Sequence, residues 1–290
     1  MKSRAGVLLA VWVACASMAL PQQDTRGIVP EDLFLVRPKP HTKASPAKPA
    51  YQAVDGQKGA AFEQSAAGRQ LGIIIWRLRL AEVGETGARI LVHEENNTLS
   101  YIPERVASTA SLSAGDRVRL SVESPAPGYL YVIDRERYSS GELSAPYLIF
   151  PTTRTRNGDN KLFSGKLIDI PAQEDQPNFF RLHKGRRDQV TEELTLMLTP
   201  ERLDGLTIGL EPLCLTDEQV SNWERQWGKA KIRTFELNGG AGKAWTQAEQ
   251  QAASDGTRLL TQEDPLPQTV YRVAAGASDP LMVKVRLKYR

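Results

Sequence analysis

The residue types that most often carry catalysis or hold metals are scattered along this chain. Its three histidines are far apart, at His41, His93 and His183. No two of them have the strand or helix spacing that brings metal ligands together. The sequence also lacks the Gly-x-Ser-x-Gly turn that carries the nucleophile of many serine hydrolases. It therefore predicts no metal site, no cofactor and no catalytic residue, and hence a protein that is not an enzyme.

Two carboxylates, Asp134 and Glu136, directly follow the apolar run 128–133. Such a pair at the end of a strand could serve as a general acid and a general base. The neighbouring Arg135 and Arg137 offer ion-pair partners, and we favour ion pairing or exposure to solvent as the interpretation of these carboxylates.

Only two cysteines are present, Cys15 and Cys214. Cys15 lies in an N-terminal apolar segment described below, so Cys214 has no intramolecular partner once that segment is removed, and no disulfide framework is expected. Cys214 stands between Leu213 and Leu215. Free cysteines usually behave as small buried apolar residues. We interpret Cys214 in this way rather than as a nucleophile or redox thiol.

Tyrosine and arginine side chains suggest where a partner could be contacted, because both types are enriched in binding hot spots. Three tyrosines lie on or after the strand that begins at Gly128, and two arginines and an Asp-Asn pair lie in the loop that follows Pro151. Packing within the sheet is the alternative role of the tyrosines. The predicted contact residues are Tyr129, Tyr131, Tyr138, Arg154, Arg156, Asp159 and Asn160.

The elements that must position these residues are mostly strands. Within 112–151, Val118, Leu120 and Val122 alternate with polar residues, which predicts a half-buried strand. Turn residues then separate the apolar runs 128–133 and 147–150. Further strands are predicted at 162–170, 178–182, 194–198, 269–274 and 281–289, and a hairpin from 72–80 and 88–93.

Two short helices near the C-terminal third interrupt this pattern. Thr216 or Asp217 can cap a helix that runs to about Trp227. Thr246 and Glu249 have the spacing of a capping box, which predicts a second helix to about Ser254. The fold class is therefore mainly β, an antiparallel β-sandwich of immunoglobulin-like or similar type.

The final predicted strand, 281–289, alternates with unusual regularity. Leu281, Val283, Val285, Leu287 and Tyr289 occupy one face, and basic residues dominate the other. A basic ribbon could contact an acidic cell-wall polymer or anionic lipid. We favour the alternative that it is a one-face-exposed or edge strand whose charges deter aggregation.

The N-terminus is typical of an export signal. A basic start, an apolar stretch at 5–16 and small residues at 17–19 predict a signal peptide over 1–19, too short to span a bilayer. Lipid attachment at Cys15 is the alternative. A Pro/Ala/Lys-rich spacer over 20–70 follows, and the folded body spans 71–290. We expect an exported protein, periplasmic or else secreted or lipid-anchored, without a transmembrane segment.

The order of motifs in 112–200 resembles the bacterial domain-of-unknown-function family 4384. The resemblance rests on the segments 115–120, 128–132, 148–152 and 193–198, with Asp159-Asn160, Gly165 and Ile170-Pro171 between them. Members of that family occur behind signal peptides or fused to kinases and protease-like domains, which implies an accessory, recognition or envelope role. The resemblance brings no catalytic residues.

The sequence thus favours a non-enzymatic, exported β-sandwich module that binds a protein or cell-envelope partner. Two alternatives stay open: a hydrolase of envelope polymer that uses carboxylates assembled by the fold, and a structural envelope component. The formal charge is +3, with acidic and basic residues interspersed. Such a balance gives no extended positive field, so a nucleic-acid partner is not expected.

Overall fold

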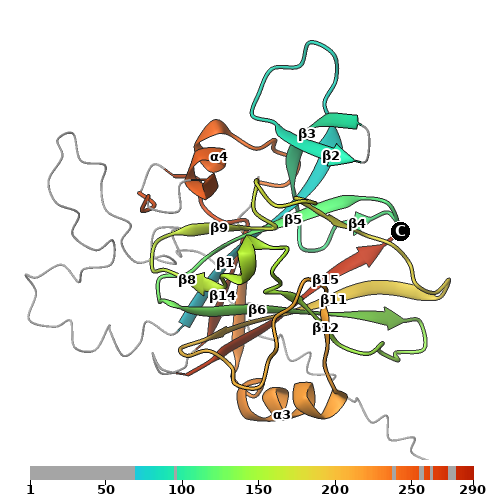
Figure 1. Ribbon diagram of the computed structural model, residues 1–290, viewed down its shortest axis with the longest axis vertical. Coiled ribbons are helices and arrows are strands. Elements are labelled where there is room, and N and C mark those ends of the chain that lie inside the picture. The colour runs from blue at the N-terminus through green and yellow to red at the C-terminus, as the bar shows by residue number, and fades with distance from the viewer. Residues whose placement is uncertain (1–68, 95–96, 237–239, 255–257, 262–263, 274–278) are drawn as a thin grey trace, which may run out of the picture.

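Two β-sheets packed face to face form the body of the protein (Figure 1). The computed structural model describes residues 69–94, 97–236, 240–254, 258–261, 264–273 and 279–290. The predicted signal peptide, 1–19, and nearly all of the predicted spacer, 20–70, lie outside these residues. The mainly β fold and the sandwich arrangement predicted from the sequence are confirmed.

The first sheet, sheet A, has eight strands, all paired in antiparallel fashion. The order β10-β5-β1-β14-β13 forms its main path, β9 pairs with β5, and the hairpin of β2 and β3 extends from β1. The strands are β1 (Arg69–Leu80), β2 (Ile90–Glu94), β3 (Asn97–Val106), β5 (Arg117–Glu123), β9 (Leu167–Ile170), β10 (Phe180–Arg181), β13 (Ile232–Glu236) and β14 (Thr269–Val273).

The second sheet, sheet B, has seven strands in the order β12-β7-β6-β11-β15-β4, with β8 beside β6. Only the short pairing of β15 with β4 is parallel. The strands are β4 (Ser111–Leu112), β6 (Gly128–Tyr138), β7 (Tyr147–Phe150), β8 (Lys161–Leu162), β11 (Gln189–Thr199), β12 (Leu213–Cys214) and β15 (Leu281–Tyr289).

The main core fills the space between the two sheets. Alternate residues of each strand point inward, and Ile73 of β1, Leu120 of β5, Leu130 of β6, Leu196 of β11 and Val283 of β15 all belong to this core. The period of two residues in these strands places their apolar side chains on one face of each sheet. Alternation visible in the sequence therefore builds the inner layer of the sandwich.

The outer face of sheet A is also covered. Ile74, Trp76 and Leu78 of β1 point away from the main core and pack in a second apolar cluster with Phe179 and Trp245. The rings of Trp76 and Trp245 lie 5.9 Å apart between centroids. Helix α4 (Gln247–Ser254) begins two residues after Trp245 and lies beside β9, at the upper left of Figure 1.

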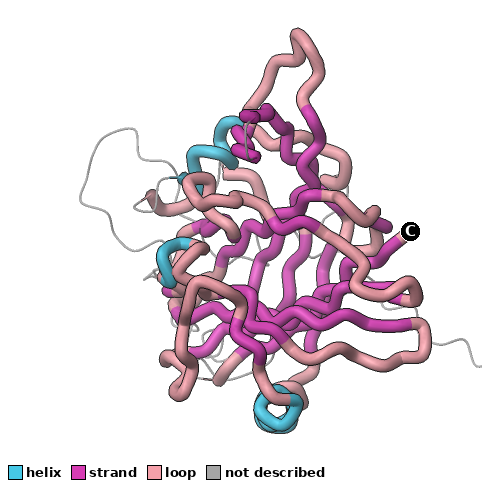
Figure 2. The backbone as a smooth tube through the Cα atoms, turned by 45° about the vertical axis from the view of Figure 1, so that its right-hand side comes forward, coloured by secondary structure: helices cyan, strands magenta, loops and turns pink. Residues whose placement is uncertain are grey.

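Helix α3 (Asp217–Trp227) covers part of the outer face of sheet B and lies at the bottom of Figure 1. Its Val220 joins an apolar cluster with Tyr131 of β6 and Met197 of β11, against which the stacked rings of Trp223 and Trp227 also pack. The two helices thus lie on opposite sides of the layered strands (Figure 2).

Both helices begin where the sequence predicts. The Thr216 hydroxyl accepts a hydrogen bond from the N–H of Gln219, whose side chain accepts one from the N–H of Thr216. Thr246 and Glu249 form the same reciprocal pair at the start of α4. The capping residues satisfy backbone N–H groups that the first helical turn leaves without partners.

Three strand predictions are wrong in detail. The segments 72–80 and 88–93 do not form a hairpin, because β1 pairs with β3, β5 and β14, and β2 pairs with β3. The apolar pattern at 162–170 is divided between β8 in sheet B and β9 in sheet A. Strand β5 is buried on both faces, not half-buried, since even Arg119 is 1% exposed. Pairing partners outside the local sequence decide all three outcomes.

Candidate functional site

A hollow of about 350 Å³ lies at the edge of sheet A, where β2, the segment after β9 and helix α4 meet. Its volume is at the lower end of the range for pockets that take small ligands. Side-chain amides and charged groups provide most of its lining. The lining residues are Arg89, Ile90, Leu91, Gln173, Glu174, Asp175, Gln176, Asn178 and Gln250.

The outer edge of β2 forms one wall of this hollow. In the described part of the chain, β2 pairs only with β3, through a register that sets Ile90 opposite Tyr101 and Val92 opposite Leu99. The other edge meets side-chain amides. The Nε2 of Gln250 donates to the carbonyl oxygen of Arg89 at 3.0 Å, and the Nδ2 of Asn178 donates to that of Leu91 at 2.9 Å.

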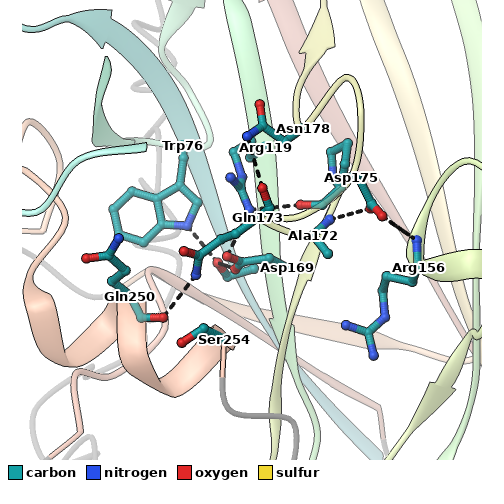
Figure 3. Close-up of polar contacts among 12 residues, drawn as sticks. Trp76, Arg119, Arg156, Asp169, Ala172, Gln173, Asp175, Asn178, Gln250 and Ser254 are labelled. Carbon is teal, nitrogen blue, oxygen red and sulfur yellow. Dashed lines mark hydrogen bonds and ion pairs between the residues drawn. The ribbon is translucent and has the colours of Figure 1, made fainter. Parts of the chain in front are cut away.

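The opposite wall is the segment 172–178, which hydrogen bonds hold in a fixed shape. The Asp175 carboxylate accepts from the N–H of Ala172 at 2.6 Å and from the N–H of Arg156 at 2.9 Å, as Figure 3 shows. The Nε2 of Gln173 donates to the carbonyl oxygen of Gln250, at 3.0 Å. A single carboxylate thus ties this segment to the loop after β7, and an amide ties it to α4.

Helix α4 presents Gln250 because a buried ion pair fixes the helix to sheet A. Glu249, the capping residue next to Gln250, lies 2.5 Å from the guanidinium of Arg105 on β3. Arg105 also stacks over the ring of Trp76, 5.5 Å from its centroid. Both charges are almost fully buried. The pairing of Glu249 with Thr246 and Arg105 therefore sets the position of the next side chain along the helix.

A buried polar network lies behind the hollow (Figure 3). The Arg119 guanidinium donates to the Asp169 carboxylate at 3.0 Å and to the carbonyl oxygen of Pro171 at 2.9 Å. The other Asp169 oxygen accepts from the hydroxyl of Ser121 at 2.5 Å, and that hydroxyl accepts from the indole N–H of Trp76 at 2.7 Å. These bonds connect β1, β5 and β9 and anchor the start of the segment 172–178.

Burial dominates the ionisation of this pair. It raises the pKa of Asp169, which the positive charge of Arg119 only partly offsets, and it lowers the pKa of Arg119. Two opposite charges in a nearly dry interior stabilise each other, but neither recovers all the hydration that it lost. We assign this network a structural role as the support of the hollow.

One buried acceptor in the lining has no donor. Asn178 is 4% exposed, and its Nδ2 donates to the carbonyl oxygens of Leu91 and Gln173. Its Oδ1 is buried and accepts no hydrogen bond from the described residues. A buried polar atom without a partner costs about 1–3 kcal/mol, so a donor supplied from within the hollow would be stabilised there.

A second unusual cluster lies at the end of the sandwich, on the inner face of sheet B. Asp134 and Glu136 of β6 and Glu192 of β11 share this face, and Glu192 lies directly opposite Glu136 in the register. Asp134 and Glu192 lie close enough for each carboxyl group to affect the ionisation of the other, and each has one buried oxygen without a hydrogen-bond partner among the described residues. Of the two interpretations favoured from the sequence, ion pairing with Arg135 or Arg137 and exposure to solvent, the pairing is wrong: Arg135 pairs with Asp217 and Arg137 with Glu193, because consecutive residues of a strand point to opposite faces.

Burial raises the pKa of Asp134 well above its usual range, and the charge of Glu192 adds to this effect. Burial likewise raises the pKa of Glu192, although its hydrogen bonds from Tyr289 at 2.7 Å and Gln189 at 2.9 Å act in the opposite direction. The Glu136 carboxylate accepts from the hydroxyl of Tyr138 at 2.8 Å. Like charges in a confined site favour sharing of a proton.

The predicted contact tyrosines do not form one surface. Tyr131 is buried on the outer face of sheet B, where its hydroxyl accepts from the N–H of Leu203 at 2.8 Å. Tyr129 packs on the same face under the guanidinium of Arg202. Tyr138 lies on the inner face, beside the carboxyl cluster. Packing, the alternative considered from the sequence, accounts for the contacts of all three rings.

The predicted loop residues also have local partners. Arg154 pairs with Glu211 at 2.5 Å, an ion pair between exposed side chains. Arg156 contributes its backbone N–H to the Asp175 carboxylate, so of the predicted contact residues it is the one bonded to the lining of the hollow. Asp159 accepts from the N–H of Lys161, and Asn160 is buried and donates to the carbonyl oxygen of Leu130.

Cys214 is exposed, contrary to the expectation of a buried residue. It lies on the edge strand β12, whose two residues pair with β7, so the flanking leucines do not bring it into the core. Among the described residues, no group of three or more His, Cys, Asp and Glu side chains is arranged to hold a metal ion.

The residues that line the hollow were not identified from the sequence. The run Gln173-Glu-Asp-Gln176 reads as an ordinary polar loop, and Gln250 as an exposed position of a short helix. Their common feature, a concentration of amides in two separate polar segments, was the only available signal. The assembled hollow is therefore suited to form hydrogen bonds with a neutral polar group.

Comparisons with protein-family models, with curated proteins and with solved structures gave no match to this chain. Function is therefore argued from the geometry of the described residues.

Proposed function

We propose that this protein is a non-enzymatic, exported β-sandwich module that binds a protein or cell-envelope partner through the hollow beside β2. The observation that carries the proposal is the convergence of amide and charged side chains from three separate segments on one concave site. Concave sites with a few convergent polar groups are the usual form of binding sites. The Arg119–Asp169 network gives this site a rigid support.

The exported location is proposed from the signal-like N-terminus, and kinship with family 4384 from the order of motifs in 112–200. Both would suit a module that acts in the cell envelope. No helix among the described residues is long and apolar enough to cross a membrane.

Binding is favoured over hydrolysis by the arrangement of the carboxyl groups. A glycosidase places its two carboxyls about 5–10 Å apart, so that the scissile bond fits between them. Asp134 and Glu192 instead affect each other's ionisation, and each has a carboxyl oxygen that is buried away from solvent. Carboxyl oxygens buried in this way do not face a cleft in which a glycosidic bond could lie between them.

A structural role for the basic face of β15 has weaker support. The ammonium of Lys284 lies 3.0 Å and the guanidinium of Arg286 3.1 Å from the carboxylate of Glu193. Lys284 also pairs with Glu224 of α3 at 2.8 Å. Because neighbouring carboxylates balance these two cations, little of their charge is left for an acidic polymer.

Site-specific photocrosslinking tests the proposed function. Gln176 lines the hollow and is exposed, so Gln176→p-benzoylphenylalanine places a reactive group there. After incubation with envelope extract and with purified cell-wall polymer, we expect a discrete adduct that excess unlabelled protein suppresses. Arg225→p-benzoylphenylalanine, at an exposed position of α3 on the other sheet, is the matched control. Equal labelling from both positions, or none from Gln176, would overturn the proposal.

A further inference from the structure

We propose that the outer edge of β2 binds a segment of the partner protein in an extended conformation, as an added β-strand. This inference rests on the proposed function, and it names the chemical class of partner: a peptide backbone, not a sugar. In strand addition, main-chain hydrogen bonds provide affinity along a sheet edge that has no neighbouring strand.

The edge of β2 has the required pattern of backbone groups. Leu91 lies opposite Ser100 in the register with β3, but its carbonyl oxygen and that of Arg89 accept hydrogen bonds from side chains on the other side of β2. The N–H and C=O of one strand residue point to the same side, so the N–H of Leu91 also faces the outer edge. β2 has five residues, which corresponds to roughly 17 Å of strand.

The Gln250 amide occupies a place that an added strand would take, whereas the Leu91 carbonyl oxygen can accept a second hydrogen bond while Asn178 stays in place. Gln250 and Asn178 donate to carbonyl oxygens two residues apart, which is the spacing at which a neighbouring strand would donate its own N–H groups. The Gln250 side chain is only partly buried, and its displacement would break one hydrogen bond. The incoming backbone N–H would restore that bond to Arg89.

The surroundings favour a peptide backbone over other ligands. The buried Oδ1 of Asn178 lacks a donor among the described residues, and a peptide N–H would supply one. Leu91 is 55% exposed and offers an apolar contact for a side chain of the added strand. The lining contains no aromatic side chain on which a sugar ring could stack.

The test uses a display library of random twelve-residue peptides, selected on the immobilised full chain. Enriched peptides are then synthesised and their binding is measured by fluorescence anisotropy. Leu91→Pro removes the outward N–H but leaves the pairing with β3, which edge strands tolerate. We expect it to weaken binding at least about tenfold, whereas Leu91→Ala, which keeps the N–H, should change the affinity less than about threefold.

A second experiment uses the unaltered protein, so its result does not depend on whether a variant folds. Methylation of alternate backbone nitrogens in the selected peptide removes the N–H groups that an added strand needs, so it should abolish binding to the unaltered protein. Undiminished binding of the methylated peptide, or of the unmodified peptide to a folded Leu91→Pro variant, overturns strand addition. Failure to enrich any peptide also overturns it.

Cell-wall oligosaccharides serve as the comparison probe. If they bind at the hollow, lose affinity on Gln176→Ala and are unaffected by Leu91→Pro, then strand addition is wrong but the proposed binding function stands. If neither peptides nor oligosaccharides bind and the crosslinker at position 176 captures nothing, both proposals fail.

Discussion

Glu192 and Glu193 are neighbours on β11, and both are at least nine-tenths buried, yet their surroundings are opposite. Glu192 points to the inner face of sheet B, where burial raises its pKa and the charge of Glu136 adds to this effect. Burial also acts to raise the pKa of Glu193, but hydrogen bonds from Arg137, Lys284 and Arg286 outweigh it and lower the pKa to about 2. Burial alone therefore does not decide the ionisation of a carboxylate here.

Asp169 on sheet A lies between these two cases. It is fully buried beside a single cation, Arg119, and its pKa is raised. The single guanidinium of Arg119 does not compensate Asp169 for its complete loss of hydration. At Glu193 three cations compensate for that loss, and the side chains of these cations remain open to solvent. The comparison predicts that the number and exposure of cations control how each site responds to mutation and pH.

The largest effect is expected from Arg119→Met, which leaves Asp169 buried without its cation. Removal of one partner of a buried pair typically costs 3–5 kcal/mol, so we expect a loss of about 4 kcal/mol in the free energy of unfolding, measured by urea titration. The double variant Arg119→Met/Asp169→Leu should recover most of this loss. A single-variant loss below about 1 kcal/mol would show that water reaches the pair.

Glu193→Gln should have the next largest effect, because it removes the charge that three cations share. We expect a loss of about 2 kcal/mol at pH 7. The folded-state pKa of Glu193 is lowered, so its stabilisation is present above the unfolded value near 4.3 and is lost as the pH falls towards 2. The variant and the wild type should therefore become equally stable near pH 2.

The matched control for this pH dependence is Glu201→Gln, which changes an exposed carboxylate in the loop after β11. It should alter the unfolding free energy by less than about 0.5 kcal/mol at any pH. A difference between Glu193→Gln and wild type that persists undiminished at pH 2 would contradict the electrostatic origin of the effect.

Glu192→Gln should have the smallest effect and the opposite sign. The pKa values of Glu192 and Asp134 are raised in the folded state, so their stabilisation is complete below the unfolded pKa of about 4 and is lost as the pH rises through the folded values. The variant removes one of the two charges that repel each other. We expect it to be more stable than wild type at pH 9, by on the order of 1 kcal/mol.

Chemical unfolding from pH 5 to pH 9 measures this difference, and Asp134→Asn should reproduce it. Parallel curves for the wild type and both variants would mean that the carboxyl groups do not share a proton, and the contrast between the two faces of β11 would then rest on Glu193 alone.

Much of the fold follows from local sequence. Apolar runs bounded by turn residues predict β6, β7 and β11, alternation predicts β15, and the capping pairs at Thr216 and Thr246 predict where α3 and α4 begin. These signals are local because a strand exposes alternate residues to one face, and a cap satisfies backbone groups within four residues. The sequence by itself thus determined a mainly β protein with two short helices.

Tertiary structure decided the rest. Strand β3, which connects β1 to β2, was not predicted, and the second covered face of sheet A turned β5 into a fully buried strand. The hollow combines Leu91, Asn178 and Gln250, which lie far apart in the sequence. Alternation along β11 places Glu192 and Glu193 on opposite faces of sheet B. The register with β6 and β15 then places carboxylates beside Glu192 and cations beside Glu193. Only tertiary structure decides this, because side-chain neighbours across a sheet depend on long-range strand pairing.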